Sequence, residues 1–576
     1  MSWLLKQKLQ EILSKEKGVK VFPPGLRNEF ALVYPNSYHI GMSNLGFHII
    51  YQLINNRADT ACERVFLPEK KLEEEYIRTN TPIMSIENQR PLYEFPLIGF
   101  SISFEMDYFN ILKILEMGKV HLLAKERTED DPIIIAGGPC ATFNPEPLSE
   151  FVDVFVIGEG EEIVNNILDT YYQYRKREYS REHILLALAQ ISGVYIPRFY
   201  EYLYKEDGTI QSIKKIADVP SLIKKQWIKE LDNYSAQTVI ITEDTEFKDL
   251  YLIEIARGCG RHCRFCMAGY CFRKPRNRSL RRLEAMLLEA KKHGKRVGLM
   301  GAAISDYPEI NQLCNKILDL DMNMSVASFR ADSITDELVK SLAKSGVKTL
   351  TLAPEAGSTK MREVINKGIT TEHLYNAIDL GIRAGIHNFR LYIMVGLPFE
   401  EEEDIEEIIE MAKIIKQYMH NMGSKGLLTL SINPFIPKPF TPFQWLPMEN
   451  MKVVENRLKY IKSSLKNAKG IDVLIESPKE AYVQGILARG DRKISNVLYD
   501  AHKLGGIKTF KKAMKKNELD ESFYLYRTRE ELEIFAWDKL DMGVARSYLY
   551  NELINAKKRK HTVRCFDGCK RCGVCD

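Results

Sequence analysis

A chain of 576 residues with 45% hydrophobic and 28% charged residues has a globular composition and is too long for one ordinary core, so we expect two to four domains. The net charge of +5 is too small to indicate nucleic-acid binding by itself, and no apolar run is long enough to cross a bilayer. The N-terminal segment MSWLLKQKLQEILSKEKGVK lacks the apolar core of a signal peptide, which predicts a cytoplasmic protein without a membrane partner.

Residues 1–185 alternate short apolar runs with helical patterns. Four of these runs read as buried strands: FALVYP, LIGFSISF, PIIIAGGP and VDVFVIGEGEE. Buried strands with crossover helices predict a doubly wound parallel sheet, whose ligands bind beyond the carboxyl ends of the strands. The small residues at these ends would let a large flat cofactor approach the backbone: Ser101 to Ser103, Gly137-Gly138 and Gly158 to Glu161.

Residues 186–245 are predicted to join two domains, and Asp207-Gly208 there indicates a β-hairpin. Residues 246–448 contain six strand candidates separated by helices: LYLIEIA, RVGLMG, NMSVASF, TLTLAP, FRLYIMVGLP and LLTLSINPF. This α/β alternation predicts a parallel barrel or a partial (β/α)6 barrel, with its chemistry at the carboxyl ends of the strands. Residues 449–576 are predicted to form a helical, basic extension that ends in a cysteine-rich tail.

Seven of the eleven cysteines fall in two groups, which indicates metal binding, since disulfides are rare in the cytosol. The first group is Cys259, Cys263 and Cys266, placed directly after the first strand of the second α/β region. A structural zinc site needs four protein ligands. Three close thiolates instead suit a cubane iron–sulfur cluster with one iron left open for a small molecule.

This C-x3-C-x2-C motif, with Phe265 before its last cysteine, resembles the radical S-adenosylmethionine (SAM) superfamily. The resemblance implies a [4Fe–4S] cluster on the three cysteines, and SAM chelated to the open iron and reductively cleaved to a 5′-deoxyadenosyl radical. LMGAA, APEAGS and VGLPFE resemble the family's cofactor-binding segments, although LMGAA departs from the usual Gly-Gly-Glu form. The resemblance nominates Phe265 in the cysteine motif and Gly301, Glu355 and Gly396 in these segments as cofactor-contacting residues. Ser328 and Arg330, which end the third strand, and Arg390, which begins the fifth, are candidates for the partner of the cofactor's carboxylate.

Three other segments resemble the subgroup that carries an N-terminal cobalamin (B12)-binding-like domain: YPNSYHIGMSNLGFHIIY, ERVFLP and PFIPKPFTPFQW. The subgroup's Asp-x-His-x-x-Gly signature is absent, and His39 is two residues from Gly41 rather than three. Many members of the subgroup lack this signature. Two alternatives therefore stay open, a domain that binds cobalamin and a degenerate domain that serves only as a substrate platform.

The second cysteine group, Cys565, Cys569, Cys572 and Cys575, has the spacing C-x3-C-x2-C-x2-C. Four thiols in such a short stretch can hold either a second iron–sulfur cluster or zinc, and the compact spacing resembles ferredoxin-type runs. A cluster there could relay electrons to the barrel or donate sulfur.

The resemblance first predicts cobalamin-assisted methyl transfer to an unactivated carbon, and the second alternative is methylthiotransferase-like sulfur insertion using the tail cluster. A flavodoxin- or ferredoxin-type reductant protein is implied. The sequence does not identify the substrate, and RNA and protein both stay open. A competing class is a non-catalytic, metal-stapled RNA-binding protein. It would use the nine Lys and Arg residues between Arg257 and Arg282, which have no acidic residue among them. The alternative for this run is a surface loop whose charges are balanced within the protein.

Overall fold

A computed structural model describes residues 2–294 and 296–575, which form two compact units. The first unit contains the chain up to Lys248 with Ile486–Glu521 and Leu532–Gly543. The second contains Asp249–Gly485, Ser522–Glu531 and the chain from Val544 onward. The expected separate extension at 449–576 is thus divided between the units. No helix in the described part of the chain combines the length and apolarity needed to span a membrane.

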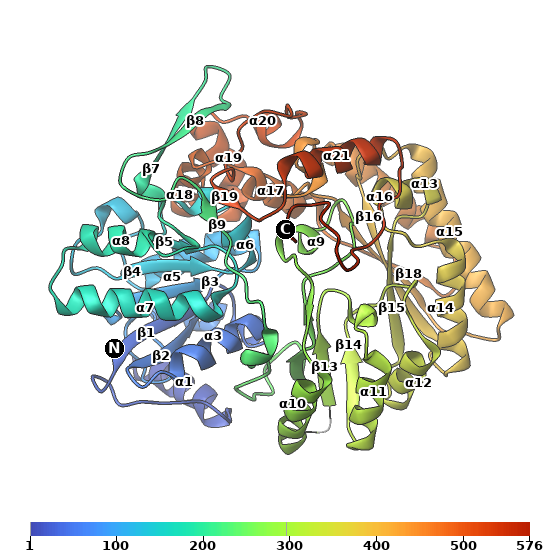
Figure 1. Cartoon of the computed structure of the whole chain (residues 1–576), viewed down its shortest axis with the longest axis horizontal. Coiled ribbons are helices and arrows are strands. Elements are labelled where there is room, and N and C mark those ends of the chain that lie inside the picture. The colour runs from blue at the N-terminus through green and yellow to red at the C-terminus, as the bar shows by residue number, and fades with distance from the viewer. Residues whose placement is uncertain (1, 295, 576) are drawn as a thin grey trace. The chain divides into compact units, whose positions relative to one another are not determined.

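The first unit is built on a six-stranded sheet in the order β2-β1-β3-β4-β5-β6, in which β1 to β5 are parallel and β6 is antiparallel to β5. The strands are β1 (Asn28–Tyr34), β2 (Thr60–Phe66), β3 (Leu97–Ser101), β4 (Ile133–Gly137), β5 (Val154–Val156) and β6 (Val194–Tyr195). This order confirms the doubly wound sheet. The longest helices between its strands are α3 (Leu45–Asn55), α5 (Tyr108–Met117) and α7 (Gly160–Lys176), coloured blue to cyan in Figure 1.

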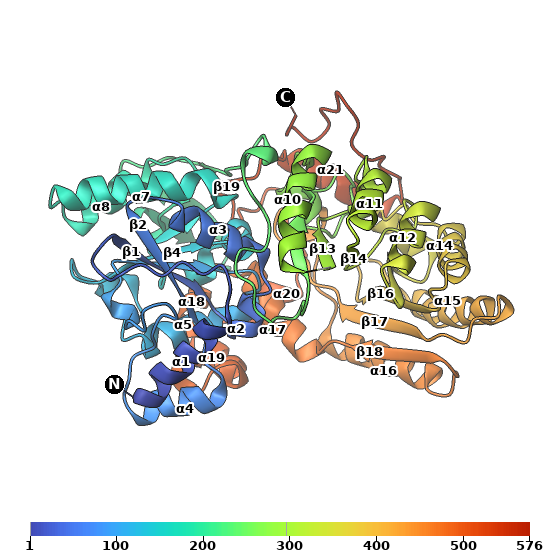
Figure 2. The ribbon, with the colours of Figure 1, turned by 90° about the horizontal axis from the view of Figure 1, so that it is seen from below.

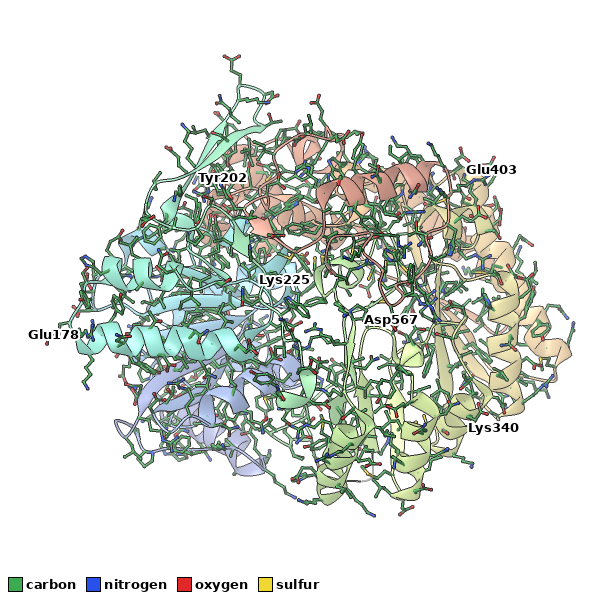
Figure 3. The ribbon with its side chains drawn as sticks, in the orientation of Figure 1. Glu178, Tyr202, Lys225, Lys340, Glu403 and Asp567 are labelled. Carbon is green, nitrogen blue, oxygen red and sulfur yellow. The ribbon has the colours of Figure 1, made fainter. Side chains whose placement is uncertain are left out.

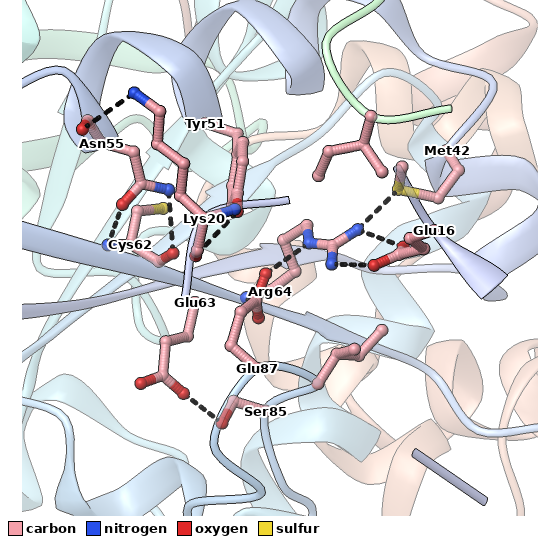
Figure 4. Close-up of polar contacts among 12 residues, drawn as sticks. Glu16, Lys20, Met42, Tyr51, Asn55, Cys62, Glu63, Arg64, Ser85 and Glu87 are labelled. Atoms are coloured by element: carbon pink, nitrogen blue, oxygen red, sulfur yellow. Dashed lines mark hydrogen bonds and ion pairs between the residues drawn. The ribbon is translucent and has the colours of Figure 1, made fainter. Parts of the chain in front are cut away.

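Strand β2 was not predicted, because Glu63 and Arg64 interrupt its apolar pattern although both are buried. Figure 4 shows why the fold accepts them. Arg64 donates two hydrogen bonds of 2.6 Å to Glu16 and one of 2.6 Å to Glu87, and Glu63 accepts one of 2.6 Å from Ser85. A buried charge is tolerated when it is paired in this way, and pairing of this kind depends on residues far apart in the sequence.

Helix α18 (Lys493–Leu504), from the expected C-terminal extension, packs in the first unit against α5. The side chain of Asn144 donates to the carbonyl oxygens of Ala488 (3.2 Å) and Gly490 (2.7 Å), and Arg492 pairs with Glu146 at 3.0 Å. These contacts are the reason that part of the expected extension belongs to this unit. The predicted hairpin is confirmed as the antiparallel pair β7 (Tyr200–Tyr204) and β8 (Ile210–Lys215).

The second unit is a partial barrel of parallel strands. All six predicted strands are present, in the sheets β10-β13-β14 and β15-β16-β17-β18, which the parallel bridge between Phe329 and Leu352 connects. The strands are β10 (Tyr251–Glu254), β13 (Arg296–Met300), β14 (Asn323–Val326), β15 (Thr349–Glu355), β16 (Asn388–Val395), β17 (Leu428–Pro434) and β18 (Ile471–Ile475). Strand β18 extends the sheet beyond the prediction, beside β17 in Figure 2.

Helices cover the outer side of these strands in Figure 1. They are α10 (Leu280–His293), α11 (Ile310–Asp319), α12 (Asp336–Lys344), α14 (Thr371–Arg383), α15 (Glu402–Asn421) and α16 (Met451–Leu465). Strand β16 alternates strictly between fully buried and half-buried residues. The ring of its buried Phe389 fills the space beside Gly381 of α14, where a Cβ would approach it to 2.8 Å. The half-buried residues of β16 therefore face the concave side of the sheet.

Candidate functional site

The three barrel cysteines lie on a loop that begins after β10 and is closed at its base. Strand β11 (Ala256–Arg257) pairs with β12 (Arg276–Asn277), so the cysteine loop leaves and rejoins the barrel at one point. Gly258 has φ of +81°, and a Cβ there would lie 2.0 Å from the carbonyl oxygen of Phe272, so only glycine fits this turn. Burial raises the pKa of the Cys259 thiol to about 12 and also raises that of Cys266.

Arg330, from the predicted cofactor set, lies directly at this loop. Its Nη1 is 3.7 Å from Sγ of Cys263, and its Nη2 donates to the carbonyl oxygen of Lys367 at 2.5 Å. Asp332 pairs with the same guanidinium at 2.9 Å. The structure thus brings Arg330 and the central cysteine together, as a cofactor chelated at the cysteine loop would require.

Glu355 lies at the carboxyl end of β15 in a left-handed conformation, with φ of +69°, next to a register shift between Leu352 and Glu355. A residue other than glycine with positive φ is strained, and such residues concentrate at functional sites. Its carboxylate accepts a 2.9 Å hydrogen bond from Nζ of Lys367, which also lies 5.8 Å from the ring centroid of Phe265. Lys367 therefore connects two predicted cofactor residues, and the sequence patterns had not identified it.

The remaining predicted cofactor residues are spread more widely. Gly301 follows β13 and is exposed, and Ser328 follows β14 and is half-buried. Gly396 has φ of +87°. Its backbone N–H donates to the carboxylate of Glu400 at 2.7 Å, so that N–H already has a partner within the turn. Arg390 is the third residue of β16, whereas Gly396 follows the end of that strand. The structure therefore does not bring Arg390 to the cysteine loop.

Asn366 joins the cysteine loop to the C-terminal tail. Its side-chain Nδ2 donates to the carbonyl oxygens of His262 (3.1 Å) and Thr562 (2.9 Å), and its Oδ1 accepts from the backbone N–H of Thr562 (2.9 Å). Next to it, the backbone N–H of Arg264 donates to Ile365 at 2.9 Å. One buried amide side chain thus holds both cysteine-containing segments.

A buried ion pair strengthens the same junction. The side chain of Arg264 is fully buried and pairs with Glu552 of α21 (Arg546–Lys557) at 3.1 Å. Glu552 also accepts a 2.8 Å hydrogen bond from Thr562 Oγ1, and Arg264 Nη2 donates to the carbonyl oxygen of Lys560 at 2.5 Å. These partners are almost 300 residues apart along the chain, so no local pattern could have predicted them.

The first tail cysteine lies against the barrel loop. The backbone N–H of Cys565 donates to the carbonyl oxygen of Gly260 at 2.8 Å, and the Cys565 Sγ is 3.5 Å from Nε2 of His262. Cys569 and Cys572 are buried, and Asp567, labelled in Figure 3, lies in the turn that precedes Cys569. The two cysteine groups that the sequence separates by about half the chain are therefore adjacent within one unit.

Comparison with known proteins identifies the class. Residues 46–197 match the family model "Radical SAM proteins, N-terminal", and residues 253–412 match "Radical SAM superfamily". The chain is 32% identical to the uncharacterized protein MJ0966 of Methanocaldococcus jannaschii over 474 residues, which cover 81% of this chain and 90% of that protein. The chain belongs to the radical SAM superfamily.

More distant relatives are named as transferases. An uncharacterized methyltransferase, PH0819 of Pyrococcus horikoshii, is 24% identical over 304 residues, which cover 49% of this chain and 58% of that protein. Threonylcarbamoyladenosine tRNA methylthiotransferase MtaB of Aquifex aeolicus is 26% identical over 223 residues, which cover 36% of this chain and 52% of that protein. The chain thus spans little more than half the length of either protein.

Membership of the radical SAM superfamily argues against the non-catalytic RNA-binding alternative. The ion pairs formed by the basic residues between Arg257 and Arg282 argue against it as well. Glu254 pairs with Arg257 (2.9 Å) and Arg278 (2.8 Å), and Arg261 pairs with Asp306 and Asp332, both at 2.8 Å. Much of the run is therefore neutralised within the protein.

In the described chain, no three His, Cys, Asp or Glu side chains lie close enough together to hold one metal ion. The assignment of metal to both cysteine groups stays a prediction from their spacing. For the barrel group the donor set fits the radical SAM cluster, because three thiols of one closed loop lie beside a cationic side chain that could neutralise a bound carboxylate.

Two of the glycines expected to let a flat cofactor approach the first unit lie against the protein's own backbone. A Cβ on Gly138 would lie 2.6 Å from the carbonyl oxygen of Ile102, and one on Gly158 would lie 2.1 Å from that of Gln226. The protein's own backbone therefore approaches both glycines on the side where a Cβ would stand, and cofactor binding at this edge of the sheet stays a prediction. His39 contacts Asp244 at 2.8 Å and Glu246 at 3.4 Å.

Proposed function

We propose that this radical SAM enzyme inserts sulfur at an unactivated carbon of an RNA or protein substrate, with the tail cysteines holding a second iron–sulfur cluster. The observation that carries the proposal is the hydrogen bond from the N–H of Cys565 to the carbonyl of Gly260, next to Cys259. A sulfur donor has to lie close to the place where the carbon radical forms. The similarity to MtaB, named a methylthiotransferase, supports the same reaction class.

When bound, a [4Fe–4S] cluster and SAM supply, with one electron, a 5′-deoxyadenosyl radical that can remove a hydrogen atom from carbon. The chain's own residues hold these groups. Arg330, which lies 3.7 Å from Sγ of Cys263 and pairs with Asp332, would bind an anionic group of the cofactor. Glu355, held by Lys367, would accept hydrogen bonds from hydroxyl groups. Asn366 keeps the tail against the loop. A flavodoxin- or ferredoxin-type protein is the proposed source of electrons.

Cobalamin-assisted methyl transfer is the second candidate. The strand order of the first unit favours it, because an order of 2-1-3-4-5 is that of a flavodoxin-like nucleotide- or cofactor-binding sheet. The crowding at Gly138 and Gly158 counts against it. We therefore assign no step to cobalamin.

The test begins with anaerobic reconstitution with iron and sulfide, followed by SAM and a chemical reductant. Formation of 5′-deoxyadenosine by the wild type, and its loss in the Cys259, Cys263 and Cys266 triple alanine variant, is the expected result. Cys314→Ala, a buried cysteine of α11, is the matched control and should retain product formation. Product formation by the triple variant would remove the barrel cysteines from the mechanism.

A second assay separates the two reactions. The cluster is reconstituted with ³⁵S-sulfide, and SAM labelled with ¹⁴C in its methyl group is added with total RNA or protein from the source cells. Transfer of both labels to a macromolecule supports sulfur insertion. Transfer of the methyl label alone, dependent on added cobalamin, would replace our proposal with methyl transfer.

A further inference from the structure

Arg390 is a cation on the concave face of the barrel sheet. It is half-buried, and its neighbours Phe389 and Leu391 are fully buried against the outer helices. The Nε atom of Arg390 is buried without a hydrogen-bond partner, and its guanidinium forms no ion pair with any residue that the structure describes. An arginine that is partly removed from water without a partner is costly, so it calls for an explanation.

Hydroxyl groups surround Arg390 on the same face. Thr351 of β15 and Thr429 of β17 are its partners in register on the two neighbouring strands. Tyr392, two residues further along β16, points to the same side and is paired in register with Ser431. Hydroxyl groups and a guanidinium together form the donor set that recognises phosphate or carboxylate oxygens.

Two nearby groups do not account for this arginine. Asp472 of β18 is in register with Thr429, one strand further away, and it forms no ion pair with Arg390. Arg390 also lies away from the carboxyl end of its strand, because it precedes the last residue of β16 by five positions, a separation of about 16 Å along the strand. Arg330, rather than Arg390, occupies the position beside the cysteine loop.

We propose that Arg390, with Thr351, Thr429 and Tyr392, binds an anionic oxygen group of the substrate, a phosphate or a carboxylate, inside the partial barrel. This inference deepens the proposed function and rests on it, since it concerns the substrate of the same barrel. The anion site holds a remote part of the substrate, so that the reacting carbon extends toward the cysteine loop. A phosphate would indicate RNA or a nucleotide, and a carboxylate would indicate an acidic side chain of a protein.

The test measures the thermal unfolding of the full-length reconstituted enzyme with inorganic phosphate, acetate or chloride as probes at equal ionic strength. The wild type should gain about 2 °C or more in Tm with one of the two oxyanions over chloride. Arg390→Met should unfold in chloride at the same or a higher temperature than the wild type, because it removes an unpaired charge, and it should lose the oxyanion-specific gain.

The control variant is Arg383→Met, which removes an exposed arginine of α14 and should keep the full gain. It also corrects for the general stabilisation that phosphate gives to folded proteins. A gain with phosphate alone identifies a phosphorylated substrate, and a gain with acetate alone identifies a carboxylate.

Three results would overturn the inference: no gain in the wild type, an equal gain in Arg390→Met, or a lower Tm of Arg390→Met in chloride. Arg390→Lys, which keeps the charge without the bidentate geometry, should retain part of the gain. None of these measurements depends on SAM cleavage. Absence of 5′-deoxyadenosine from the wild type would therefore count against the proposed function and leave the anion site standing.

Discussion

Cys565 and Gly260 are joined by a backbone hydrogen bond of 2.8 Å, which places the first cysteine of the tail beside the first cysteine of the barrel loop. The contact is made by main-chain atoms and is reinforced by Asn366 and by the pair of Arg264 with Glu552. A terminal segment is usually poorly ordered unless it is held in place. Here the tail is held where the barrel chemistry is expected.

The iron content should reveal a second cluster. Changing Cys569 and Cys572 to alanine should lower the iron of the reconstituted enzyme from about eight to about four atoms per chain, while 5′-deoxyadenosine is still formed. Cys62→Ala, which removes a buried cysteine of the first unit, should leave the iron content unchanged. One zinc per wild-type chain, with only four iron atoms, would show that the tail is a structural zinc site.

Asn366 should control how firmly the tail is held. Asn366→Gly removes the three hydrogen bonds of the Asn366 side chain. Glycine adopts the φ of +52° at this position without strain, so the variant tests the side-chain amide alone. If the three hydrogen bonds together contribute about 2 kcal/mol, trypsin should cleave after Arg559 or Lys560 about 30-fold faster. Asn421→Gly, at the exposed end of α15, should not change this rate. Unchanged cleavage in Asn366→Gly would mean that other contacts hold the tail.

The sequence predicted those parts of the fold that depend on local pattern. The six barrel strands, the doubly wound sheet and the hairpin follow from apolar periodicity and turn residues. Helix α10 has its predicted bounds, since Ser279 caps it by accepting from Arg282 and Gly294 ends it. Strand β2 was missed because its charges are paired with residues far along the chain.

The candidate site also contains residues that local patterns predict and residues that they do not. Its cysteines could be recognised from spacing, because the ligands of one cluster come from one loop. Lys367, Asn366 and Glu552 could not, because each acts through a contact formed only when distant segments meet. The glycines at 138 and 158 show another limit of the sequence. A small residue signals close approach, but the sequence does not say whether a cofactor or the protein's own backbone approaches.

Glu552 should be important for stability because its loss leaves the buried Arg264 without its carboxylate. Glu552→Ala should lower the free energy of unfolding by about 3–5 kcal/mol, and Glu552→Gln by less, because it keeps an acceptor for Thr562. Glu410→Ala, on the exposed face of α15, should change it by less than about 0.5 kcal/mol. Urea unfolding measures all three. Equal values for Glu552→Ala and Glu410→Ala would contradict the role of the ion pair.

Lys367 should tune cofactor binding through Glu355. Lys367→Met removes the 2.9 Å contact that orients this carboxylate, and loss of one charge-assisted hydrogen bond should raise the KM for SAM about tenfold or more. The measurement is the rate of 5′-deoxyadenosine formation against SAM concentration. Lys344→Met, at the exposed end of α12, is the control. A lower KM in Lys367→Met would show that the lysine competes with the cofactor for Glu355.

His48 should make the first unit acid-sensitive. Its Nε2 lies 2.9 Å from the carbonyl oxygen of Met42, and its Nδ1 accepts from the N–H of Val239 at 3.2 Å, so the folded protein holds the neutral ring. Burial lowers the pKa of His48 to about 4, below the ordinary value of about 6.5 in the unfolded chain. Between these values the unfolded state binds more protons. The stabilisation is therefore complete above about pH 6.5 and is lost as the pH falls toward 4, by about 2 kcal/mol at pH 5.

Urea unfolding at pH 8 and pH 5 should show a smaller loss of unfolding free energy for His48→Gln than for the wild type. His121→Gln, at an exposed position, should match the wild type. An equal loss in His48→Gln would assign the acid sensitivity to other groups.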